Sequence, residues 1–65
     1  MIFGITINYK NKEMYQKVIK IPLNSTIKVL KDEDMYIITL SNDIDTHLYE
    51  LKEKEINGFE IKRIN

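Results

Sequence analysis

The chain of 65 residues contains no cysteine, tryptophan or alanine, and it has only two glycines, one proline and one arginine. Without cysteine no disulfide can staple the fold, and no Cys/His cluster exists to hold a structural zinc ion. A chain of this length buries only about 60% of the surface that its unfolded state exposes. We therefore expect stability from a very regular fold, or from burial against a second copy in a homodimer or against an obligate partner.

Long hydrophobic runs are also absent. The opening segment MIFGITINYK has no basic residues ahead of its apolar ones, and its apolar run ends by Asn8. Those features fit neither a secretory signal peptide nor a membrane span. We expect one small domain over residues 1–65, located in the cytoplasm and independent of membranes.

The abundant residues are twelve isoleucines, nine lysines, six asparagines and four tyrosines, all of which have A/T-rich codons. This composition is typical of a low-GC bacterium or of a mobile element that lives in one. A very short chain without catalytic motifs fits an accessory gene of a phage or plasmid, such as an anti-defence gene, better than a metabolic enzyme.

The net charge is zero, but the two halves of the chain differ in sign. Residues 1–31 carry six lysines and one glutamate, and residues 32–65 carry nine acids against three lysines and one arginine. Such asymmetry marks a polyanion-binding face or an acidic docking face, or else two halves that pair across the fold.

Alternating apolar residues predict a strand over Ile2–Tyr9, with its odd-numbered side chains on one face. A second strand over Met14–Ile21 follows a polar turn, and a three-residue loop would pair Ile7 with Tyr15. Pro22 cannot donate a hydrogen bond, so it ends that strand or lies on an edge.

A second hairpin is predicted from Thr26–Leu30 and Met35–Leu40, with a four-residue loop that pairs Leu30 with Met35. Ile38 and its apolar neighbours make the second of these segments the candidate central strand. The last predicted strand covers Phe59–Ile64. One face of the hairpin is expected to carry Ile27, Val29, Tyr36, Ile38 and Leu40.

The stretch Asp43–Phe59 carries several signals of an amphipathic helix. Asp45 is a favoured N-cap residue, and Ile44 with Tyr49 has the spacing of a hydrophobic staple. Gly58 is suited to the left-handed position that ends a helix. The competing interpretation is a hairpin turn at Asn57-Gly58, which would place Glu55 opposite Glu60.

The helical interpretation gives an α+β fold with element order ββββαβ, a small antiparallel sheet of four to five strands and one helix packed on one face. The alternative is an all-β fold, as an SH3-like or OB-like barrel.

Two groups of side chains are candidate binding residues. The acidic group can dock on a basic groove of another protein, although acids are also common in turns for backbone reasons alone. It comprises Asp32, Glu33, Asp34, Asp43 and Asp45.

The second group interleaves aromatic residues with lysines, a pattern that stacks bases and contacts phosphates on β-modules. The same residues also suit core aromatics and lysines that guard an edge strand. They are Tyr9, Lys10, Lys12, Tyr15, Lys17 and Lys20.

Catalytic chemistry has little support in the sequence. His47 is the single histidine, and its spacing from Asp43 and Asp45 matches neither a calcium loop nor a helical zinc site. Neither glycine belongs to a phosphate-binding loop, and no serine has the context of a nucleophile. We expect no catalytic residue, no metal and no cofactor.

These observations predict a non-enzymatic interaction protein, an inhibitor or regulator from a phage or other mobile element that binds a host macromolecule. A protein is the expected partner. The alternative function is a small nucleic-acid-binding β-module that uses the basic first hairpin.

Overall fold

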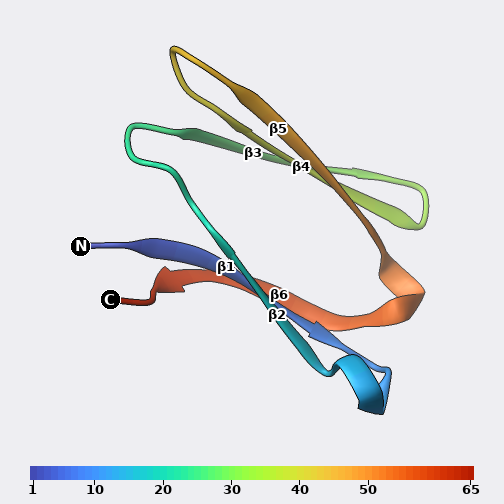
Figure 1. The fold of residues 1–65 in the computed structure, drawn as a ribbon. Coiled ribbons are helices and arrows are strands. Elements are labelled where there is room, and N and C mark those ends of the chain that lie inside the picture. Colours follow the sequence, from blue (N-terminus) through green and yellow to red (C-terminus); the bar gives the residue numbers. More distant parts are fainter.

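The computed structural model describes every residue from Met1 to Asn65 and contains six β-strands and two short 3₁₀ turns (Figure 1). The turn η1 (Lys12–Met14) connects the first two strands, and η2 (Glu53–Glu55) connects the last two. The strands are β1 (Phe3–Tyr9), β2 (Gln16–Lys20), β3 (Thr26–Asp32), β4 (Met35–Ser41), β5 (Thr46–Lys52) and β6 (Ile56–Arg63).

The strands form two antiparallel sheets that have no hydrogen-bonded ladder between them. Sheet A has the strand order β2-β1-β6, and sheet B has the order β3-β4-β5. β1 is the middle strand of sheet A because β2 and β6 pair with its two edges. The predicted central strand, β4, is confirmed as the middle strand of sheet B.

The core lies between the sheets and is built by the alternation seen in the sequence. Ile5 and Ile7 of β1 are fully buried, as is Ile38 of β4, and Leu40 is 1% exposed. In a strand every second side chain points to the same face, so these residues form one apolar layer from each sheet. The remaining buried apolar residues are Ile19, Leu51 and Ile56.

Both hairpin registers differ from their predictions by two residues, although the predicted faces are correct. Ile7 pairs with Lys17 instead of Tyr15, because η1 lengthens the connection between β1 and β2. Asp32 pairs with Met35, so the β3–β4 loop has two residues instead of four, and Glu33 adopts a φ of 55° to close it. A shift of two residues keeps every side chain on its original face.

The predicted helix is wrong, and with it the α+β class. Residues 46–52 form β5, and only the single turn η2 is helical. The spacing of Tyr49 and Leu51 fits one face of a helix and also one face of a strand. Hydrogen-bonded pairing with β4 stabilises the strand. Asp45 caps no helix, since the Asn42 side chain accepts 2.8 Å hydrogen bonds from the amides of Ile44 and Asp45 in a turn. The all-β alternative fits the structure.

The competing hairpin at Asn57-Gly58 is also not formed. These residues lie inside β6, where Asn8 pairs with Gly58 but Tyr9 pairs with Ile56, so that Asn57 is an extra residue. This irregularity is a β-bulge, and Gly58 takes a φ of 151° that L-residues rarely adopt. β5 and β6 therefore do not pair with each other, but belong to different sheets.

The two ends of the sandwich differ (Figure 1). At the η2 end, Tyr36 of sheet B contacts Phe59 of sheet A edge-to-face, with ring centroids 5.1 Å apart. The Glu53 amide donates to the Asp34 carbonyl at 2.8 Å, which ties the β3–β4 loop to η2. The opposite end holds both termini, the β2–β3 corner and the β4–β5 loop.

The molecule exposes more surface than its mass requires. The accessible area is 5053 Å² for a chain of 7.8 kDa, whereas an ordinary monomer of this mass exposes about 4,400 Å². Only 9 of the 65 residues are buried. The structure contains no helix with the length and apolar character needed to cross a membrane.

Candidate interaction surface

The open end of the sandwich exposes apolar side chains that belong to the core layer. Phe3 and Ile61 lie on the same face as Ile5, yet they are 43% and 46% exposed. Ile5 itself is completely buried. The apolar interior therefore continues to the solvent at this end, because no element of the chain covers it.

These side chains line the largest hollow in the molecule, a groove of about 880 Å³. Phe3 and Ile61 contribute from sheet A, Ile21 contributes from the residue after β2, and Ile27 contributes from sheet B. Met1 and Leu23, which are 76% and 78% exposed, also line it, and Ile2 completes its apolar lining. We call these seven residues the end groove. Grooves of this size with mostly apolar walls are typical ligand or partner sites.

The corner between β2 and β3 shapes one wall of the end groove. The Ile21 amide donates to the Phe3 carbonyl at 2.9 Å, so the chain stays paired with β1 up to this point. Pro22 follows and cannot continue the ladder. Asn24 then adopts a φ of 60°, which turns the chain toward sheet B. Leu23 thus projects at the tip of a corner and has little intramolecular cover.

Polar groups are sparse along this groove. Its lining includes Lys20, Asn24 and Ser25 beside the apolar residues. The Ser25 hydroxyl is buried and has no hydrogen-bond partner in the structure. The surface chemistry therefore favours an apolar occupant, with few fixed groups to orient a charged metabolite.

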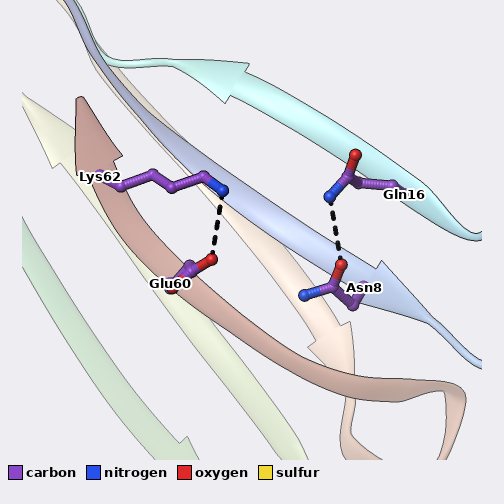
Figure 2. A network of polar contacts seen from close by, with 4 residues as sticks. All are labelled: Asn8, Gln16, Glu60 and Lys62. Atoms are coloured by element: carbon purple, nitrogen blue, oxygen red, sulfur yellow. Dashed lines mark hydrogen bonds and ion pairs between the residues drawn. The ribbon is translucent and has the colours of Figure 1, made fainter. Parts of the chain in front are cut away.

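The outer face of sheet A contrasts with this groove. Figure 2 shows the Gln16 amide donating to the Asn8 side chain, at 3.3 Å, and Lys62 beside Glu60, also at 3.3 Å. These four polar side chains form two pairs on this face. The outer face therefore has the character of an ordinary solvated surface, and the end groove does not.

The predicted acidic group is divided by the fold. Asp32, Glu33 and Asp34 lie at the β3–β4 turn, near η2, whereas Asp43 and Asp45 lie in the β4–β5 loop. The seven-residue strand β4 separates the two loops. The structure thus brings the first three together and places the other two at the open end.

The predicted nucleic-acid face is also divided. Tyr9 is partly buried and packs on the core, and Tyr15 is 71% exposed beyond η1. Lys17 is opposite Ile7, on the inward-facing side of sheet A, while Lys20 is opposite Gly4 on the outer side. Lys10 and Lys12 lie around η1. These six residues do not form one continuous stacking surface.

The remaining titratable groups form no compact cluster. His47 is exposed and lies opposite Leu40 on β5, and no group of three His, Cys, Asp or Glu residues is placed to hold a metal ion. One shifted group is Lys31, whose pKa is raised above 10.5 by a hydrogen bond and the charge of Glu53, with a smaller contribution from Tyr36. This ion pair lies at the closed end.

The sequence contained one usable signal for the end groove. Pro22 marked the end of β2, and the apolar residues Ile21 and Leu23 flank it on both sides. Apolar residues on both sides of a proline that ends a strand indicate a corner that faces an apolar surface. The gathering of Met1, Phe3 and Ile61 at the same place depends on the pairing of β1 with β6, which no local pattern reveals.

The fold and the groove define a small all-β protein of two packed sheets with its core open at one end. Searches with protein-family models, against curated proteins and against solved structures give no match to this chain.

Proposed function

We propose that this protein is a non-enzymatic interaction protein that binds an extended apolar segment of a partner protein in the end groove. The observation that supports this most is the exposed end of the core, where Phe3, Leu23 and Ile61 face solvent within one groove. Burial of one such side chain contributes about 1.5–3 kcal/mol. Two or three partner side chains in this groove would contribute about 3–9 kcal/mol, which offsets part or all of the cost of association.

The excess exposed area of the molecule is similar to the area that one partner buries in a typical complex. The molecule exposes about 650 Å² more than an ordinary monomer of its mass. A standard interface removes about 800 Å² from each partner. A bound segment would thus bring the exposed surface of the chain to the level expected for a compact protein.

An inhibitory or regulatory role in a phage or plasmid is the finer proposal. It rests on the short chain, the absence of catalytic motifs and the A/T-rich codon composition. The partner would then be a host protein. Phage or anti-defence genes next to the coding gene would support this role, and a neighbourhood of replication genes would argue for nucleic-acid binding instead.

Selection of random peptides on the immobilised protein tests the groove directly. We expect the selected peptides to carry two or three large apolar residues, and their ¹H–¹⁵N shift perturbations to be centred on Phe3, Ile21–Ile27 and Ile61. Leu23→Ser should weaken binding by about tenfold, because Leu23 would be buried only in the complex. It should leave the fold unchanged, since this side chain is 78% exposed in the free protein.

The matched control is Leu48→Ser, a change of the same chemistry on the outer face of sheet B, where Leu48 is 58% exposed. This variant should bind the selected peptides as the wild-type protein does. Equal loss of binding in both variants, or shift perturbations on the outer face, would contradict the groove as the binding site.

A further inference from the structure

The edge of sheet B formed by β3 is an unpaired strand. β3 hydrogen-bonds to β4 on one side only, and six of its seven residues are exposed. In an antiparallel ladder alternate residues direct their backbone N–H and C=O groups away from the neighbouring strand. β3 therefore presents a row of free donors and acceptors, which is a template for another strand.

We propose that β3 pairs antiparallel with β3 of a second copy about a two-fold axis through Leu30, which joins two B sheets into one six-stranded sheet. In this register Leu30 lies opposite its own counterpart. Lys28 lies opposite Asp32 of the second copy, and the symmetry repeats this opposite-charge pair. Val29 lies opposite Lys31. An isologous contact requires such a self-complementary surface.

The charges along TIKVLKD select this register among its neighbours. An axis through Lys28 or through Lys31 would place two lysines directly opposite each other, which is destabilising. An axis through Val29 would place Asp32 opposite Thr26 and Lys28 opposite Leu30, with no charge pair. The axis through Leu30 forms two ion pairs and opposes no like charges.

The side chains on both faces fit the same arrangement. Leu30, which is 61% exposed, already lies beside Ile37 in a row across the outer face of sheet B. Leu30 of the second copy would continue that row and cover it. On the inner face Val29 is 43% exposed, and the aliphatic stem of the opposite Lys31 can lie against it while its ammonium stays on Glu53.

The chain leaves room for this pairing. The five paired residues, 28–32, lie toward the β3–β4 turn and away from the corner at Pro22. None of the charged residues that would make the ion pairs lines the end groove. Self-association and partner binding therefore use separate surfaces, and variants of one should spare the other.

The mass of the protein in solution gives the first test. Sedimentation equilibrium between about 10 μM and about 1 mM should show a concentration-dependent shift from 7.8 kDa to twice that mass. Alternate amides of β3, those not donated to β4, should exchange with deuterium more slowly at the higher concentration. A mass that stays at 7.8 kDa throughout this range would overturn the proposal.

Charge exchange tests the register. Lys28→Asp alone and Asp32→Lys alone each place like charges opposite each other twice, so each variant should dimerise at least about tenfold more weakly. An equimolar mixture of the two variants should form a heterodimer, because both cross-strand pairs then have opposite charges. The double variant K28D/D32K should dimerise as the wild-type protein does.

The control exchanges charges elsewhere. Lys12→Asp and Asp45→Lys alter the same residue types in exposed positions away from β3 and should leave dimerisation unchanged. Far-UV circular dichroism at dilute concentration checks that every variant is folded. Dimerisation that is equally strong in all variants would show that the lysines of β3 only guard an edge and that another surface associates.

Discussion

At the scale of single residues, Thr6 is the clearest local defect in the fold. It lies in the middle of β1, is 1% exposed, and its hydroxyl has no hydrogen-bond partner. Leaving such a group buried and unpaired costs about 1–3 kcal/mol. A side chain of the same shape without the hydroxyl would avoid that cost.

Thr6→Val should therefore raise the free energy of unfolding by about 1 kcal/mol, since valine keeps the branched shape and removes the unpaired hydroxyl. Urea denaturation measures the change. The same substitution at exposed Thr46 serves as the control and should have an effect within about 0.5 kcal/mol. A loss of stability in Thr6→Val would mean that the hydroxyl makes a bond the structure lacks.

The ion pair of Lys31 with Glu53 predicts a dependence of stability on pH. The pKa of Lys31 in the folded state lies above 10.5, so its contribution to stability is fully present below that pH and is lost as the pH rises through the folded-state pKa. Glu53→Gln should lower the melting temperature at pH 7–9. Above about pH 11 the melting temperatures of the wild-type protein and the variant should converge, whereas adding Glu53→Gln to a Lys31→Met background should have the same effect at every pH.

At the scale of elements, the bulge in β6 depends on a single glycine. Gly58 has a φ of 151°, and a Cβ atom at this position would meet no other atom within 4 Å. Any effect of a side chain here is therefore a backbone effect. The bulge lets β6 follow β1 while Ile56 still turns inward to the core.

Gly58→Ala should destabilise the fold by about 1–3 kcal/mol, because an L-residue is strained at this φ. Chemical denaturation of the variant measures this loss. D-alanine at the same position, introduced by chemical synthesis, should restore most of the stability, because its mirror-image preference suits positive φ. Equal destabilisation by both enantiomers would instead indicate a steric cause.

The elements also show which structural features local sequence patterns can predict. The facing of Ile5, Ile7, Ile38 and Leu40 follows from alternation alone and was predicted correctly. The stretch 43–59 was not, because Leu48, Tyr49 and Leu51 fit a helix by local propensity and a strand by pairing. Seven residues of β5 pair with the edge of β4. The stabilisation from this strand pairing exceeds the few tenths of a kcal/mol that side-chain pairs would add to a helix.

At the scale of the whole molecule, the sandwich is closed at one end and open at the other. Tyr36 and Phe59 pack against each other across the sheets near η2, whereas near the termini the β2–β3 corner connects the sheets and the end groove stays exposed. The end groove and the free edge of β3 are both left uncovered by the other elements of the chain. The predicted binding residues are charged, apart from Tyr9 and Tyr15, whereas the fold leaves exposed an apolar groove and the backbone groups of an edge strand.

The sequence by itself determined which residues point inward along most strands, and that strands end at Pro22 and at the β3–β4 turn. It also predicted that a chain of this length would have a marginal core. Only the tertiary structure decided that Asp43–Phe59 is a strand, a 3₁₀ turn and a bulged strand, and that Phe3, Leu23 and Ile61 meet in one groove. Side-chain alternation is a property of neighbouring residues, so it can be read locally. Sheet membership and register depend on pairing such as that of β1 with β6, between the two ends of the chain, and no local signal specifies it.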